Sequence, residues 1–173
     1  MAKIHLVVGP VGAGKSTFAL QLCEDNKAVH LSLDEWMTGL FKDDRPEHDV
    51  IPWYLERSQR CIDQIWDTTQ RLLRQDTNVV LEIGLIQKQQ RNDFYQRVDT
   101  DGFDLKIHVL DADKELRRQR VERRNQEQGA TFSMEVSPEV FELANSMWQA
   151  FSTEECDGRD VTFITVEQEA VFA

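Results

Sequence analysis

The chain has 173 residues, of which 40 % are hydrophobic and 29 % are charged, and its formal net charge is −11. This length and composition are typical of one globular domain, so we expect a single domain over residues 1–173. The excess of acidic residues argues against a broad nucleic-acid-binding surface, which needs clustered lysine and arginine. The sequence contains neither an apolar run of membrane-spanning length nor a secretory signal pattern, and it therefore predicts a cytoplasmic protein with no membrane attachment.

Short apolar runs alternate along the chain with segments of helical character. The runs predict strands at Lys3–Val8, Ala28–Leu33, Asn78–Ile83, Leu105–Leu110 and Val161–Val166. The intervening segments predict helices at Lys15–Glu24, Trp53–Gln75, Gln87–Val98 and Lys114–Asn125, with another from the Ser137-Pro138 pair through Phe151. This alternation predicts an α/β fold with a parallel sheet and helices on both faces. Ligands of such folds bind where the strands end, at their carboxyl edge.

The stretch GPVGAGKST, between the first strand and the first helix, fits the pattern G-x-x-x-x-G-K-[ST]. Glycines let the backbone N–H groups turn inward, where they and the helix N-terminus attract phosphate. The lysine can reach the β- and γ-phosphates, and the serine hydroxyl can bind Mg²⁺. The stretch predicts a phosphate-binding loop, or P-loop, formed by Gly9, Gly12, Ala13, Gly14, Lys15, Ser16 and Thr17.

The loop alone does not define the reaction, because many P-loop proteins share it. A guanine-reading motif such as NKxD is missing, since Asn26-Lys27 is followed by Ala28-Val29. A mechanical ATPase usually ends an apolar run with adjacent acids, whereas Val79–Glu82 carries one acid. A small phosphotransferase is the class that remains.

Three acids follow or end predicted strands, at the edge where ligands bind. Asp34 follows the second predicted strand and is our candidate for the base that accepts the proton of an attacking hydroxyl. Glu35 is expected to support it at the substrate site. Glu82 is expected to hold Mg²⁺ through water or to contact the substrate. The alternatives are that Asp34 caps a helix starting at Glu35 and that Glu82 is a structural hydrogen-bonding acid.

Arginines recur on one face of the helix at Lys114–Asn125. Arg117, Arg120 and Arg124 have the spacing i, i+3 and i+7, and a polar loop with Gly129 follows them. A basic helix and such a loop predict a lid over about residues 117–137, whose closure brings arginine to the transferring phosphoryl group. The alternative is a solvated charged helix that pairs with the acidic C-terminal part.

Taken together, the P-loop, the SLDEW and EIG stretches and the LRRQRVERRN helix resemble the small P-loop kinases with AAA-type ATP-binding domains. This group is related to the kinase domain of polynucleotide kinase, to chloramphenicol phosphotransferase and to zeta toxins. The resemblance runs over roughly residues 3–151. Its more specific part runs from Arg120 to Phe141, where an R-V-x-x-R-N run is followed by TFS and P-E-x-F. The stretch AFSTEECDG lacks the prolines that often end the last helix of the closer relatives.

The resemblance implies a three-layer P-loop fold with strand order 2-3-1-4-5. It also implies roles for single residues. Lys15 and Ser16 would bind ATP and Mg²⁺, Asp34 would activate the acceptor, and Arg120 and Arg124 would contact ATP phosphates. Glu82 and Arg91 would lie near the acceptor. Residues 36–60 would shape the acceptor pocket.

The sequence thus predicts an ATP- and Mg²⁺-dependent kinase that transfers the γ-phosphate to a hydroxyl of a small molecule, acting as a monomer or homodimer. One alternative is a nucleic-acid 5′-hydroxyl kinase, although the acidic composition makes nucleic acid the weaker expectation. Another is an ATP-binding regulatory module with slow hydrolysis and a protein partner. No motif identifies the acceptor.

Overall fold

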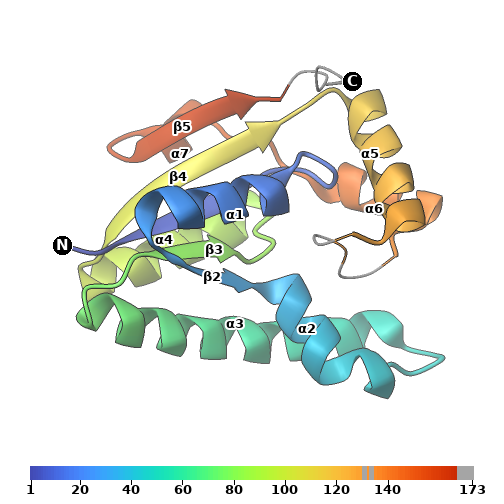
Figure 1. Ribbon diagram of the computed structural model, residues 1–173, viewed down its shortest axis with the longest axis horizontal. Coiled ribbons are helices and arrows are strands. Elements are labelled where there is room, and N and C mark those ends of the chain that lie inside the picture. Colours follow the sequence, from blue (N-terminus) through green and yellow to red (C-terminus); the bar gives the residue numbers. More distant parts are fainter. Residues whose placement is uncertain (130–131, 133–134, 167–173) are drawn as a thin grey trace.

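The computed structural model describes residues 1–129, 132 and 135–166, and its centre is one five-stranded sheet. All the strand pairs are parallel, and the order is β2-β3-β1-β4-β5, which confirms the prediction (Figure 1). The strands are β1 Lys3–Val8, β2 Val29–Ser32, β3 Val79–Glu82, β4 Asp104–Asp111 and β5 Asp160–Thr165.

The helices are α1 Lys15–Asn26, α2 Leu33–Phe41, α3 Val50–Arg74, α4 Lys88–Asp101, α5 Lys114–Glu127, α6 Pro138–Met147 and α7 Thr153–Cys156, with a 3₁₀ turn at Lys42–Asp44. Three differ most from the sequence prediction, one of them α2, which was expected only as the alternative helix starting at Glu35. The helix expected to continue through Phe151 ends at Met147, and the short α7 that follows was not predicted. Among the described residues, no helix has both the length and the apolar character needed to cross a membrane.

Local capping explains where two of the helices begin. The Ser32 hydroxyl accepts a hydrogen bond from the Glu35 amide (3.4 Å), so β2 stops at Ser32 and α2 begins at Leu33, inside the predicted strand. The predicted cap of α6 is present, because the Ser137 hydroxyl accepts from the Val140 amide (3.3 Å) and Pro138 occupies the first turn.

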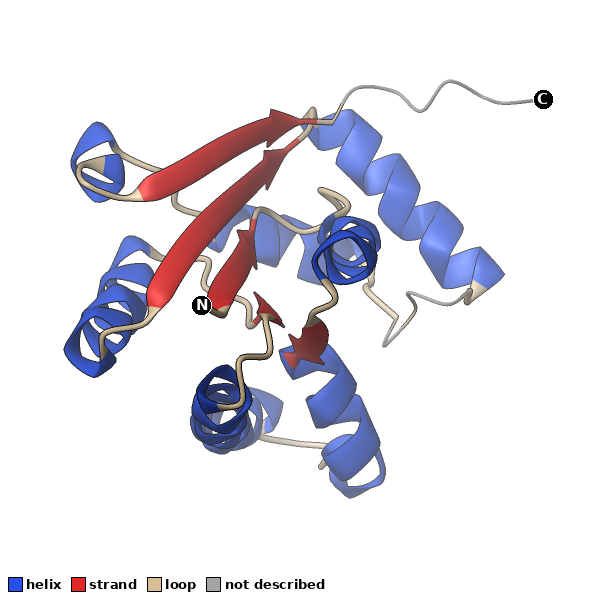
Figure 2. Ribbon diagram, turned by 60° about the vertical axis from the view of Figure 1, so that its left-hand side comes forward, coloured by secondary structure: helices blue, strands red, loops and turns tan. Residues whose placement is uncertain are grey.

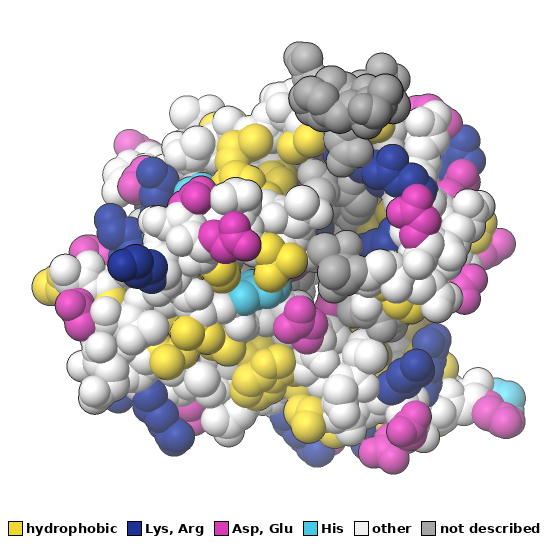
Figure 3. Space-filling view, in the orientation of Figure 1, with side chains coloured by type: hydrophobic (Ala, Val, Ile, Leu, Met, Phe, Trp, Pro, Cys, Tyr) yellow, Lys and Arg dark blue, Asp and Glu magenta, His cyan; other side chains and the backbone are white. Residues whose placement is uncertain are grey.

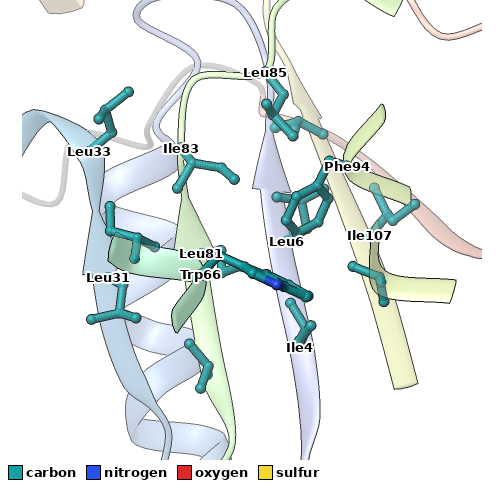
Figure 4. Packing of buried hydrophobic residues seen from close by; sticks show 14 of the residues in the cluster. Ile4, Leu6, Leu31, Leu33, Trp66, Leu81, Ile83, Leu85, Phe94 and Ile107 are labelled. Atoms are coloured by element: carbon teal, nitrogen blue, oxygen red, sulfur yellow. The ribbon is translucent and has the colours of Figure 1, made fainter. Parts of the chain in front are cut away.

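Helices cover both faces of the sheet, which confirms the layered architecture (Figure 2). Alternate β1 residues such as Ile4 and Leu6 point into a larger core with α3 and α4, where Trp66 lies edge-on to Phe94 (Figure 4). The intervening Val7 belongs to a smaller core against α1. Both cores are built from closely packed apolar side chains, so they hold the strand ends, and with them the loops of the site, in fixed relative positions.

A histidine pair is buried on the α1 face. His5 Nδ1 lies 3.1 Å from His108 Nε2 on the neighbouring strand, the rings are stacked with 5.4 Å between centroids, and Phe18 covers His108. Burial lowers the pKa of both imidazoles, and that of His108 falls to about 4. The unfolded chain therefore binds protons more readily than the folded chain between about pH 6.5 and pH 4, and the stability conferred by the neutral pair is lost as the pH falls.

We predict that moving from about pH 7 to about pH 5 lowers the free energy of unfolding by about 2 kcal/mol through this pair. Urea unfolding at a series of pH values measures the effect. His108→Gln should flatten the dependence, whereas His48→Gln, in an exposed loop, should leave it unchanged. Equal pH dependence in the two variants would contradict the assignment.

Candidate functional site

The loop GPVGAGKST connects β1 to α1 and lies against the end of β4 and the start of α5. The Ala13 amide donates to the Pro10 carbonyl (3.2 Å), and Gly14 (φ 94°) is the N-cap of α1. A Cβ on Gly9 would lie 2.4 Å from the Leu110 carbonyl oxygen, and one on Gly12 (φ 80°) would lie 2.6 Å from the Arg117 carbonyl oxygen. Glycine is therefore required at both positions, and the loop leaves backbone N–H groups and a helix N-terminus for phosphate.

A carboxylate and a hydroxyl meet beside the loop. Ser16 Oγ donates to Glu82 Oε1 (2.9 Å), while Glu82 Oε2 lies 3.3 Å from His30 Nε2. Burial alone would raise the pKa of Glu82, but His30, Lys15 and Ser16 together outweigh it, and the pKa lies below its usual value. Glu82 is thus an anion at neutral pH, on the strand next to the P-loop strand.

This pair suits a nucleotide-bound Mg²⁺. Mg²⁺ prefers oxygen ligands and usually keeps several waters, with one or two protein oxygens and the substrate phosphates completing its shell. No cluster of three or more His, Cys, Asp or Glu residues suited to a metal occurs in the described part of the chain. The Ser16 hydroxyl and the Glu82 carboxylate would therefore hold the ion together with the phosphates.

Asp34 lies close to the P-loop lysine. It occupies the first turn of α2, and because Ser32 is the cap, the alternative that Asp34 caps this helix is wrong. Its side chain reaches solvent, yet the protein crowds it on several sides. This burial raises its pKa, Glu82 raises it further, and Lys15 and Arg124 act against the rise. A raised pKa makes this carboxylate a better proton acceptor than an ordinary aspartate.

Lys15 lies at the centre of these charges. Its Nζ donates to the Pro10 carbonyl (2.9 Å). Burial lowers its pKa, Glu82 and Asp34 oppose that effect, and Arg124 adds to it. Glu82 and Arg124 are therefore near enough to act on the pKa of both Lys15 and Asp34, although the four residues come from four elements, α1, α2, β3 and α5.

Arg124 is half-buried on α5, and its Nε is buried without a hydrogen-bond partner among the described residues. A buried, unsatisfied guanidinium nitrogen close to the P-loop lysine suits a phosphate oxygen. Arg120 is half-buried one turn earlier on the same helix. Residues 130–131 and 133–134 of the predicted lid lie outside the described residues. Within the predicted lid, the Asn125 side chain exchanges two hydrogen bonds (2.7 and 3.2 Å) with the Val136 backbone.

Arg117 has a different position from the two arginines that follow it. Its buried guanidinium donates to the carbonyls of Ala112 (3.0 Å) and Val11 (3.1 Å) and to Asn145 Oδ1 (2.8 Å). It also lies over the Phe141 ring (5.8 Å). Arg117 thus joins the P-loop, α5 and α6, and it fixes the base of the predicted lid.

Arg91 is not part of this group. It is fully buried in a two-pronged ion pair with Glu155 of α7, and it lies over the Phe151 ring (4.3 Å). Tyr95 Oη donates to the same carboxylate (3.3 Å). Because Glu155 and the Ile86 carbonyl already occupy its guanidinium, Arg91 holds α7 against α4, and we leave it out of the candidate site.

Two residues near the site had no signal strong enough to single them out in the sequence. His30 lies on β2 with no motif around it. The parallel register, which pairs Ser32 with Glu82, brings it beside that carboxylate. Tyr54 is half-buried on α3; burial raises the pKa of its hydroxyl, and Asp34 raises it further, so Tyr54 lies near Asp34.

The parallel sheet and its glycine-rich loop define a P-loop nucleotide-binding protein. The profile of the AAA domain family matches residues 4–147, and the chain belongs to that family. The resemblance to P-loop kinases of the AAA type is thereby confirmed. A search of curated proteins gives no significant match.

Solved structures share the fold. A presumed kinase from Chloroflexus aurantiacus J-10-fl has a TM-score of 0.71 and 18 % identity, over 95 % of this chain and 85 % of that one. Kti12 from Chaetomium thermophilum, solved with ADP-AlF3, has a TM-score of 0.67 and 15 % identity, over 94 % and 88 %. A chain of the Pnkp1/Rnl/Hen1 RNA repair complex has a TM-score of 0.59 and 24 % identity, over 84 % and 43 %.

We predict that Arg91→Ala destabilises the fold by about 3–5 kcal/mol, because it leaves Glu155 charged, buried and unpaired. The double variant Arg91→Met with Glu155→Leu removes both charges and should recover most of that loss. Thermal and urea unfolding measure both. An Arg91→Ala protein as stable as the parent would contradict the structural role.

We also predict that Gly12→Ala weakens ATP binding about tenfold or more, because the new methyl group meets the Arg117 carbonyl and the backbone has a positive φ. Gly39→Ala is the matched control, since a Cβ at that helical position meets nothing within 4 Å. Titration calorimetry with ATP and Mg²⁺ compares the two. Unchanged affinity in Gly12→Ala would argue against phosphate binding at this loop.

Proposed function

We propose that the protein is an ATP-dependent phosphotransferase that moves the γ-phosphate of ATP to a hydroxyl group of a small molecule. The observation that carries the proposal is the grouping of Lys15, Asp34, Glu82 and Arg124 at the carboxyl edge of the sheet. A P-loop with cations on one side and a basic carboxylate on the other has the parts that phosphoryl transfer needs. Membership of the AAA domain family supports the same class of activity.

The residues would have different roles in the reaction according to their charge. The P-loop N–H groups and Lys15 would bind the β- and γ-phosphates, and Arg124, with Arg120 on the same helix, would stabilise the charge of the transferring group. Ser16 and Glu82 would hold Mg²⁺, which, when bound, neutralises phosphate charge. Asp34 would accept the proton of the attacking hydroxyl, and its raised pKa suits that step. Glu35, on the same turn of α2, would support the acceptor.

A second candidate is a kinase for nucleic-acid 5′-hydroxyls. The fold likeness to a chain of an RNA repair complex favours it, although this chain spans 43 % of that one. The net charge of −11 opposes it. Oligonucleotide binding that weakens steeply with added salt would support this candidate, and no binding at low salt would remove it.

We predict that Asp34→Asn keeps ATP binding and lowers phosphoryl transfer by about 100-fold or more, because the acceptor loses its base. The assay follows label from γ-labelled ATP into pools of sugars, nucleosides, amino alcohols and 5′-hydroxyl oligonucleotides. Asp25→Asn, an exposed acid on α1, serves as the control and should transfer at the parental rate.

Two results would contradict the proposal in different ways. Full transfer by Asp34→Asn would remove the assigned base and leave the reaction class intact. Tight ATP binding with slow release of phosphate, unaffected by every pool, would instead support a nucleotide-dependent regulatory module.

A further inference from the structure

The acceptor side of the site contains hydroxyl groups that the proposed reaction does not yet use. Tyr54 and Ser58 are one turn apart on α3 and share a face with Cys61, whose sulfur lies 3.8 Å from the Met37 sulfur. That contact packs this face of α3 against α2, the helix that carries Asp34. Tyr54, Ser58 and Asp34 are therefore held by two helices in direct contact.

Ser58 has an unusual environment for a hydroxyl. Its side chain is 7 % exposed, and its Oγ makes no hydrogen bond of standard geometry among the described residues, although it lies close enough to the Tyr54 hydroxyl to donate weakly toward it. A buried hydroxyl left without a partner costs stability, and such groups are often completed by a ligand or by water. Ser58 lies close enough to the half-buried Tyr54 hydroxyl to affect its titration, and so does Asp34. Two hydroxyls and a carboxylate thus form one polar group beside the phosphate site.

The charges around this group disfavour an anionic acceptor. Asp34 and Glu35 are both in the first turn of α2, and the segment at residues 42–49, between α2 and α3, has four acids against two bases. On α3, Arg57 is held over the rings of Trp53 (4.8 Å) and Phe41 (5.7 Å), and Arg60 pairs with Glu56. Figure 3 shows acidic and basic side chains mixed at the lower right, where the α2–α3 connection lies.

We propose that Tyr54 and Ser58 form an acceptor subsite that binds, next to Asp34, a small hydroxyl compound that carries no anionic group. This inference rests on the proposed phosphotransferase function and specifies its acceptor. The two hydroxyls donate to and accept from hydroxyls of the acceptor and turn the reacting one toward Asp34. An acceptor that already carries phosphate or carboxylate is repelled by Asp34, Glu35 and the acidic 42–49 segment.

The test offers matched pairs of acceptors with γ-labelled ATP: a sugar and its phosphate ester, a nucleoside and its monophosphate, an amino alcohol and its phosphate ester. We expect transfer to the uncharged or cationic member of at least one pair, about tenfold or more faster than to its anionic partner. Faster transfer to an anionic member would overturn the inference and leave the proposed function standing. Transfer to no compound at all would contradict both the proposed function and this inference.

Once this assay has identified an acceptor, Tyr54→Phe should raise the KM for that acceptor about tenfold, while the KM for ATP stays at the parental value. Ser58→Ala should act in the same direction. The chain's other tyrosine supplies the control, because Tyr95→Phe removes a hydroxyl that contacts Glu155, away from Asp34. Melting temperatures verify folding of all three variants. An unchanged acceptor KM in both Tyr54→Phe and Ser58→Ala would overturn the subsite.

Discussion

The close approach of the P-loop backbone to β4 and α5 is the constraint on which the site depends. Only glycine fits at Gly9 and Gly12, where the carbonyl oxygens of Leu110 and Arg117 leave no room for a Cβ. Arg117 then fastens the contact by donating to the Val11 carbonyl within the loop. The helix that carries Arg124 therefore begins directly against the phosphate loop, and its position follows from backbone packing.

That packing places opposite charges around one small volume. In the proposed site, Lys15 and Arg124 would face the phosphates, and Asp34 and Glu82 would serve the acceptor and the metal. The two carboxylates are not equivalent. Hydrogen bonding keeps Glu82 an anion, while burial and the neighbouring Glu82 make Asp34 more basic. Two acids whose environments shift their pKa values in opposite directions are suited to different tasks, one as a ligand and one as a base.

Much of this arrangement could be predicted from local sequence. The P-loop has a fixed spacing, the strands are short apolar runs, and the Ser137-Pro138 cap has an unambiguous pattern. The start of α2 was harder, because Ser32 and Asp34 are both good capping residues and the sequence does not choose between them.

The roles of two arginines depended on partners far along the chain. Glu155, which buries Arg91, is 64 residues away, and Asn145, which binds Arg117, is 28 residues away. Helical periodicity identified the face of α5 on which Arg117 lies. It did not show whether that face contacts bound phosphate or the rest of the protein. The roles of the Tyr54 and Ser58 hydroxyls likewise depend on the packing of α2 against α3, which the sequence does not predict.

The central claim is that the P-loop, Lys15 and the α5 arginine act together on a transferring phosphoryl group. Binding of ADP with Mg²⁺, measured with and without aluminium fluoride, tests this most directly, because the fluoride mimics that group. We predict that aluminium fluoride tightens ADP binding about tenfold or more in the parent protein. In Arg124→Ala, ADP should still bind, but aluminium fluoride should no longer increase its affinity. Equal affinity with and without fluoride in the parent, or a gain that survives in Arg124→Ala, would contradict the account.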